Sequence, residues 1–197
     1  MNRLICITGI DGAGKSTLVN NIATKISPVY IASIWDIMNS ATTLFSTKKD
    51  IDNYLCALTA DSRVLFLAHA LKYSLDKALE SGKEKILLNS YYYKYFAAEL
   101  ALGASEKLVL SLIKTFPQPD ITIYLDISIE EAAERKKIIS RYESGLIMYP
   151  AKDNFIAFQK TALNKWNYFE KTNWHTINTS APPVQVLNET VKLIERL

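Results

Sequence analysis

Strand-like and helix-like segments alternate along this chain of 197 residues, and the alternation predicts an α/β fold built around a parallel sheet. Five short segments are rich in apolar or β-branched residues, as are strands buried in such a sheet. The segments between them carry the apolar spacing of helices that cover a sheet. No internal repeat, low-complexity tract or domain boundary interrupts this order. We therefore expect one domain that spans residues 1–197.

The first half of the chain predicts two strands and several helices. Arg3–Thr8 is almost continuously apolar, as expected for a strand buried on both faces. A glycine loop follows it, and Ser16–Lys25 then predicts a helix. Pro28–Trp35 is rich in β-branched and aromatic residues and predicts the second strand. Lys48–Leu79 has a helical pattern long enough for two helices, which Ser81-Gly82 ends.

The second half continues the alternation. Ser128 is a predicted helix N-cap, and Glu131 three residues later completes the pattern of a capping box. That helix is expected to run to about Ile139. The other predicted elements are strands at Ile86–Leu88, Ile121–Asp126 and His175–Asn178, helices at Tyr93–Leu102, Ser105–Phe116, Phe155–Lys171 and Val184–Arg196, and a loop at Arg141–Lys152.

A phosphate-binding loop at Gly9–Thr17 is the strongest functional signal in the sequence. Its nine residues, GIDGAGKST, match the motif G-x-x-x-x-G-K-[ST] between a buried strand and a helix. Glycines let the backbone wrap closely, so that N–H groups point at phosphate oxygens, and the helix N-terminus adds its dipole. Lys15 is expected to reach the outer phosphates and Ser16 to ligate Mg²⁺. The predicted triphosphate-binding residues are Gly9, Asp11, Gly12, Ala13, Gly14, Lys15, Ser16 and Thr17.

Three segments resemble the thymidylate kinase family of nucleoside monophosphate kinases. ITGIDGAGKST is similar to the family's loop, including the acidic residue at Asp11, and PDITIYLDISIEEAAERKK is close to its fourth strand and following helix. The family has Asp-Arg-Tyr after its third strand, with a small residue six places beyond the tyrosine. Here Asn89-Ser90-Tyr91 stands in that place, followed by Ala97.

The resemblance implies a P-loop three-layer sandwich, in which helices cover both faces of a five-stranded parallel sheet and a lid lies near residues 136–152. It also implies ATP with Mg²⁺ as the phosphate donor, a nucleoside monophosphate as the acceptor, with thymidylate the leading candidate, and a homodimer. A lid arginine neutralises the transferred group in this family. Arg135 and Arg141 lie in that region, and Arg141 is preferred because it begins a loop that can fold over the site. The alternative for these arginines is a solvated helix face.

The acceptor-binding residues implied by the resemblance are Asp11, Arg63, Asn89 and Tyr91. Asn89 brings no charge to the metal shell, and Ser90 lacks the guanidinium that grips an acceptor phosphate. Arg63 is the candidate replacement, with a surface arginine as the alternative. The aromatic residues Tyr91, Tyr92, Tyr93, Tyr95 and Phe96 either stack a base or build the core.

Three functions remain open from the sequence. The first is a kinase of a nucleoside monophosphate. The second is a P-loop kinase of a nucleoside or another small hydroxyl substrate, which the missing acceptor arginine favours. The third is a nucleotide-binding protein with little catalysis, in which Asn89 marks the decay of the metal site. An assay across acceptors separates the three.

Composition limits the other partners. Apolar residues make up 49% of the chain and charged residues 22%, as in soluble proteins with a core. The net charge of +3 suits an anionic substrate but is too small for a dedicated nucleic-acid-binding domain. Two cysteines form neither a disulfide framework nor a metal cluster. Without a signal peptide or a stretch of roughly 20 apolar residues, we expect no membrane association and a cytoplasmic protein.

Overall fold

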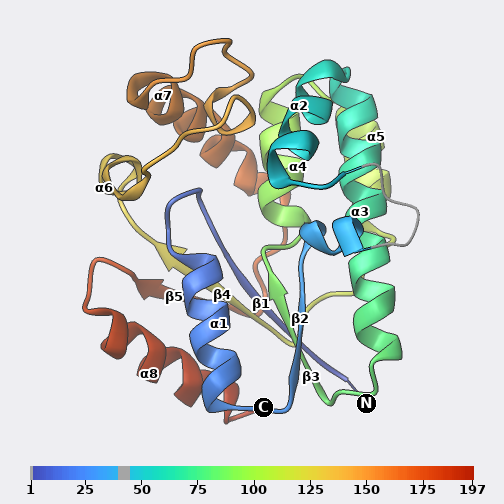
Figure 1. Cartoon of the computed structure of the whole chain (residues 1–197). Helices are drawn as coiled ribbons and strands as arrows, with labels where there is room; N and C mark the ends of the chain where they lie inside the picture. The colour runs from blue at the N-terminus through green and yellow to red at the C-terminus, as the bar shows by residue number, and fades with distance from the viewer. Residues whose placement is uncertain (1, 40–44) are drawn as a thin grey trace.

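Five parallel strands form a single sheet in the computed structural model, which describes residues 2–39 and 45–197. The strand order is β2–β3–β1–β4–β5 (Figure 1). β1 (Arg3–Gly9) is central and pairs with β3 (Lys85–Asn89) on one side and β4 (Ile121–Asp126) on the other. β2 (Val29–Ala32) and β5 (Trp174–Asn178) form the edges. The predicted α/β class and parallel sheet are confirmed.

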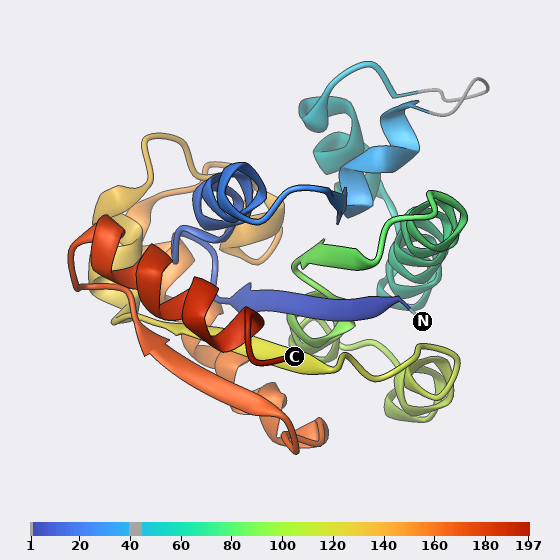
Figure 2. The ribbon, with the colours of Figure 1, turned by 90° about the horizontal axis from the view of Figure 1, so that it is seen from below.

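Helices cover both faces of the sheet, as Figures 1 and 2 show. Alternate residues of β1 face opposite layers: Ile5 and Ile7 pack in the core under one helical layer, whereas Leu4 and Cys6 pack in the core under the other. Within the described ranges, no helix combines the length and the apolar character that crossing a bilayer requires. The helices of the two layers are α1 (Lys15–Lys25) and α8 (Pro183–Ile194) on one face, and α3 (Ala60–Glu80), α4 (Tyr92–Ala101) and α5 (Glu106–Ile113) on the other.

Most of the remaining helices lie around the carboxyl ends of the strands, where open parallel sheets bind ligands (Figure 1). They are α2 (Lys48–Ala57), α6 (Ile129–Arg135), α7 (Lys152–Leu163) and two short 3₁₀ helices at Ile34–Asn39 and Tyr142–Ser144. A further 3₁₀ helix at Asn164–Tyr168 packs on the face of the sheet that α4 covers, where Trp166 contacts Tyr124 and Trp174. The segment between α6 and α7 corresponds to the predicted lid near residues 136–152 and contains only the short turn at Tyr142–Ser144.

Several predicted boundaries were wrong. The second strand ends at Ala32 because the chain turns into a 3₁₀ helix, where the Asp36 carboxylate accepts a hydrogen bond from the Ser33 N–H at 3.0 Å. The helix after Ser128 ends at Arg135 rather than near Ile139, since Lys136 is already extended. The helix predicted at residues 155–171 begins at Lys152 and becomes 3₁₀ after Leu163.

The N-cap at Ser128 is confirmed, but the capping box is only half formed. The Ser128 hydroxyl accepts from the Glu131 N–H at 3.1 Å. The Glu131 carboxylate accepts instead from Arg135 at 2.7 Å and from Ser180. The bond from Ser180 connects α6 to the segment that follows β5.

Candidate active site

The phosphate-binding loop connects β1 to α1 in the conformation that the motif predicts. Gly14 is the N-cap of α1 with φ of +90°, a left-handed conformation that glycine adopts without strain. Gly12 also has positive φ, and a Cβ at this position would lie 2.4 Å from the Ala132 carbonyl oxygen. The loop therefore lies directly against α6, and its curvature depends on glycine at position 12.

Lys15 lies inside the curve of this loop. Its side chain is buried, and its Nζ donates to the Ile10 carbonyl oxygen at 2.6 Å. Burial and the nearby charge of Lys94 together lower the pKa of Lys15 to about 7, although Asp11 acts in the opposite direction. An ammonium in this position is placed to contact the phosphates that the loop holds.

A cavity of about 820 Å³ opens beside the loop, at the carboxyl ends of the strands. This volume is sufficient for a nucleotide. Two of the described residues lining the cavity are carboxylates, Asp11 and Glu143. The cationic residues that line it are Lys15, Lys48, Lys94, Arg135 and Lys136. Five cations against two carboxylates make the cavity suited to polyanions.

Asp11 is tied to a cation that the sequence analysis missed. Its Oδ1 lies 2.6 Å from Nζ of Lys94 on α4, and both side chains are mostly buried. Burial alone would raise the pKa of Asp11, but the charges of Lys94 and Lys15 outweigh it and hold the pKa at about 2. Burial alone would likewise lower the pKa of Lys94, yet Asp11 holds it above the ordinary value. The pair is therefore fully charged at neutral pH.

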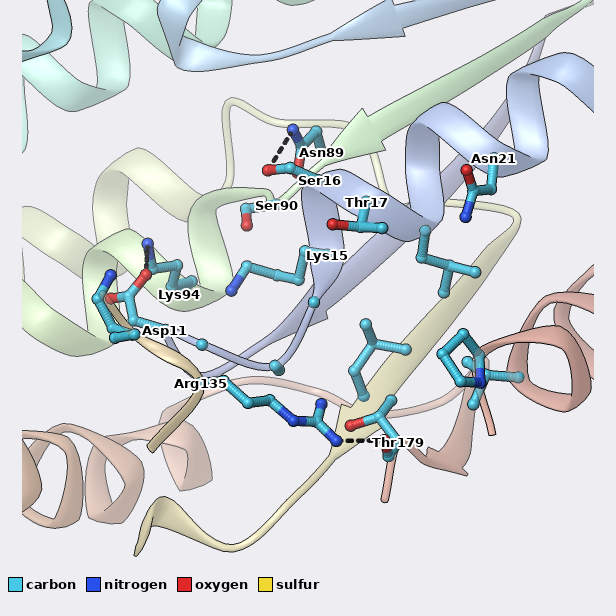
Figure 3. Close-up of a pocket in the computed structure, with 18 of the residues that line it drawn as sticks. Asp11, Lys15, Ser16, Thr17, Asn21, Asn89, Ser90, Lys94, Arg135 and Thr179 are labelled. Atoms are coloured by element: carbon cyan, nitrogen blue, oxygen red, sulfur yellow. Dashed lines mark hydrogen bonds and ion pairs between the residues drawn. The ribbon is translucent and has the colours of Figure 1, made fainter. Parts of the chain in front are cut away.

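Asn89, at the end of β3, and Ser90, directly after it, occupy the positions of the Asp-Arg pair found in the family that the sequence resembles. Asn89 approaches Ser16, with Nδ2 at 3.2 Å from the hydroxyl oxygen. Ser90 is buried and has φ of +65°, an unfavourable conformation for a residue other than glycine. Both residues line the cavity. Figure 3 shows Lys15 extending below Ser90 toward Asp11 and Lys94.

The two arginines predicted in the lid region occupy different places. Arg135 lines the cavity, and its guanidinium donates to Glu131 and to the Thr179 carbonyl, each at 2.7 Å. Arg141 is not among the lining residues, whereas Glu143 of the following turn lines the cavity. Tyr142 of that turn is buried in the core, where its hydroxyl donates to Glu99 at 2.8 Å. Lys136, the next residue after Arg135, lines the cavity instead and pairs with Glu143 at 2.6 Å.

The structure does not bring Arg63 or Tyr91 to the cavity. Arg63 is 3% exposed, and its Nε lies 2.9 Å from a carboxylate oxygen of the fully buried Glu99. Tyr91 packs in the core and donates its hydroxyl to the Pro117 carbonyl at 3.1 Å. Tyr92, Tyr93 and Phe96 are core residues as well. Tyr95 is the member of this aromatic group that lines the cavity.

Sequence reasoning missed Lys94 and the segment at 179–183, which follows β5 and lines the cavity beside Arg135. Both positions follow the carboxyl end of a predicted strand, which is the edge where a parallel sheet binds ligands. That rule, applied to every strand, would have selected them. Trp35, which the sequence placed at the end of the second strand, also lines the cavity, and the Lys48 ammonium lies 5.0 Å from its ring centre.

A parallel sheet with a phosphate loop after its central strand, a lysine inside that loop and a cation-rich cavity define a P-loop phosphotransferase. A family model described as thymidylate kinase matches residues 7–190. The chain therefore belongs to the thymidylate kinase family, and it is a phosphotransferase of the nucleoside monophosphate kinase type.

Individual relatives agree with this family. The probable thymidylate kinase 1 of Saccharolobus solfataricus is 25% identical over 203 residues, covering 100% of this chain and 98% of that protein. A probable thymidylate kinase of Sulfurisphaera tokodaii is 30% identical over 141 residues, covering 68% of this chain and 69% of its own. A solved structure of thymidylate kinase from Candida albicans superposes with a TM-score of 0.72 at 19% identity, covering 99% of this chain and 92% of that one. That similarity confirms the fold.

Proposed function

We propose that this protein transfers the γ-phosphoryl group of ATP to a nucleoside monophosphate, with thymidylate as the preferred acceptor. Its relatives carry the name thymidylate kinase, which supports the choice of acceptor. The product pair would be ADP and thymidine diphosphate. A homodimer, as the family resemblance implies, belongs to the same proposal, and light scattering of the purified protein tests it.

The ion pairing of the cavity's carboxylates carries this proposal. Among the described lining residues, Asp11 is paired with Lys94 and Glu143 with Lys136. A nucleoside hydroxyl must lose a proton during transfer and needs a base near the operating pH. Asp11, with its pKa near 2, is a poor base. A phosphate monoester is already ionised at neutral pH, so its oxygen can attack without a base.

The loop residues would position the donor. Lys15 and the loop amides would hold its outer phosphates, and Arg135 with Lys136 would neutralise the charge that spreads over the transferred group. Mg²⁺, when bound, would neutralise negative charge on the phosphates. The donor set fits such an ion, since Mg²⁺ keeps several waters and takes few protein ligands. Ser16 would supply one oxygen, and Asn89 would accept a hydrogen bond from a metal-bound water.

The experiment is an acceptor screen. Coupled ADP release is measured at fixed MgATP with dTMP, dUMP, the other nucleoside monophosphates and the free nucleosides. We expect dTMP to give the highest kcat/KM. Turnover with nucleosides but not with monophosphates would establish the second function, which the loss of a guanidinium at Ser90 favours. ATP binding without stimulation by any acceptor would establish the third, a nucleotide-binding protein.

Asn89→Asp is expected to improve the use of Mg²⁺. A carboxylate beside Ser16 would bind metal-bound water more strongly than the neutral amide, and such outer contacts change metal affinity by about 10- to 100-fold. We expect the free Mg²⁺ concentration that gives half the maximal rate to fall by about 10-fold. Asn188→Asp, exposed on α8, is the control for added negative charge. An unchanged Mg²⁺ dependence in Asn89→Asp would contradict a metal beside Ser16.

A further inference from the structure

The cavity lacks an arginine where an acceptor phosphate would be expected to bind. Ser90, the residue directly after β3, has a short hydroxyl side chain. Arg63 is paired with Glu99, and Arg141 does not line the cavity. Arg135 points toward Thr179, on the other side of the loop from Ser90 (Figure 3). The described arginines therefore leave the Ser90 side of the cavity without a guanidinium.

Lys94 supplies a cation on this side. It lies four residues after Ser90, so the first turn of α4 brings it to the same wall of the cavity. Its side chain is 16% exposed, and its Nζ lies 2.6 Å from Asp11 and 4.9 Å from the centre of the Tyr95 ring. An ammonium has three N–H donors, so the contact with Asp11 leaves capacity for a phosphate oxygen.

The arrangement of the cations divides the cavity into two ends. Figure 3 shows the side chains of Lys15 and Lys94 near Ser90 and Asp11, whereas Arg135 extends toward Thr179. The phosphate loop lies between the two ends. A donor whose nucleoside occupies the Thr179 end would place its outer phosphates at Lys15, facing Lys94. An acceptor phosphate at Lys94 would then face the group that is transferred.

We propose that Lys94 binds the phosphate of the acceptor nucleotide in place of the missing arginine, and that Asp11 orients it. This inference rests on the proposed function, because it assigns the acceptor end of the same site. The oxygen of the acceptor phosphate attacks the γ-phosphorus, and the bond from that phosphorus to the bridging oxygen of ADP breaks. Lys94 keeps its proton throughout and acts by charge and position.

The test compares Lys94→Met with Lys94→Arg in steady-state kinetics and in calorimetric binding of dTMP and thymidine. Lys94→Met should raise the KM and Kd for dTMP by about 10- to 100-fold, since it removes a charge-assisted hydrogen bond in a buried site. The KM for ATP and the affinity for thymidine should change by less than about threefold. Lys94→Arg should retain most of the dTMP affinity. Lys72→Met, on the surface of α3, is the control.

A double variant separates phosphate binding from simple neutralisation of Asp11. Lys94→Met leaves the Asp11 carboxylate without its partner, which can weaken the fold, whereas Lys94→Met with Asp11→Asn removes both charges. We expect the double variant to fold and still to bind dTMP weakly. If it binds dTMP as the wild type does, Lys94 only neutralises Asp11 and the inference is overturned.

Binding and turnover distinguish this inference from the proposed function. If the wild-type protein phosphorylates dTMP and Lys94→Met binds dTMP with unchanged affinity, only the inference about Lys94 is overturned. If the wild-type protein binds nucleoside monophosphates without phosphorylating them, and Lys94→Met binds them more weakly, the proposed function is overturned and the inference about Lys94 is supported. Failure of the wild type to bind any nucleoside monophosphate would overturn both.

Discussion

Lys15→Ala is expected to slow phosphoryl transfer by about 10³-fold, because it removes the cation that the loop places at the outer phosphates. The ammonium contacts the loop itself through the Ile10 carbonyl, so it is already in position before nucleotide binds. Alanine leaves the developing charge of the transferred group without this neutralisation. The measurement is coupled ADP release at saturating ATP and dTMP.

Lys25→Ala is the matched control for this variant, since Lys25 is exposed at the last turn of the same helix. It should keep the wild-type rate. Circular dichroism and thermal unfolding must show that Lys15→Ala is folded. A folded Lys15→Ala protein that keeps more than a tenth of the wild-type rate would remove the basis for assigning the phosphate loop a role in transfer.

Arg63→Met is expected to lower the free energy of unfolding by about 3–5 kcal/mol, the usual cost of removing one partner of a buried ion pair and leaving the other charge uncompensated. Glu99 is fully buried, and it also accepts a hydrogen bond from the Tyr142 hydroxyl at 2.8 Å. Without Arg63, its carboxylate would have no compensating charge. Denaturant unfolding measures the change, and Arg63→Met with Glu99→Gln should recover more than half of it.

The loss should depend on pH in a definite direction. Burial already raises the pKa of Glu99 to about 6, although Arg63 and Tyr142 act against it. Removal of Arg63 raises this folded-state pKa further above that of the unfolded chain. The destabilisation relative to wild type should therefore be smaller at pH 5, grow as pH rises from about 6 toward the new pKa, and level off above it. A loss equal at pH 5 and pH 8 would contradict this account. Lys72→Met, which breaks an exposed pair, should cost at most about 0.5 kcal/mol.

Local patterns were sufficient to predict the sheet and the phosphate loop. The apolar run at Arg3–Thr8 became the central strand, and the nine-residue motif became a loop ending in the N-cap Gly14. Both depend on neighbouring residues in the sequence, so both can be read directly from it. The short strand β2 was overestimated because Asp36 turns the chain through a contact with Ser33. A turn that depends on a side-chain contact cannot be predicted from apolar composition alone.

The placement of the candidate cations, whether inside or outside the site, depends on contacts between distant segments. Arg63 is buried because Glu99, 36 positions away, packs against it. Lys94 reaches the site because Asp11, on a different element, holds its ammonium. A lysine within the aromatic sequence YYYKYF shows no local signal for either contact. Family resemblance indicated the missing arginine at Ser90, but only the tertiary structure shows which cation lies nearby.

The buried position of Lys15 has a consequence for proton balance. With a pKa near 7 when no nucleotide is bound, the Lys15 side chain is largely a neutral amine in slightly alkaline solution. Phosphate oxygens favour the ammonium and raise that pKa, so nucleotide binding takes up a proton from the solvent above pH 7. Affinity for the triphosphate therefore decreases as pH rises from about 7 toward the ordinary pKa of lysine. The same burial that places the amine against the loop links nucleotide occupancy to the acidity of the medium.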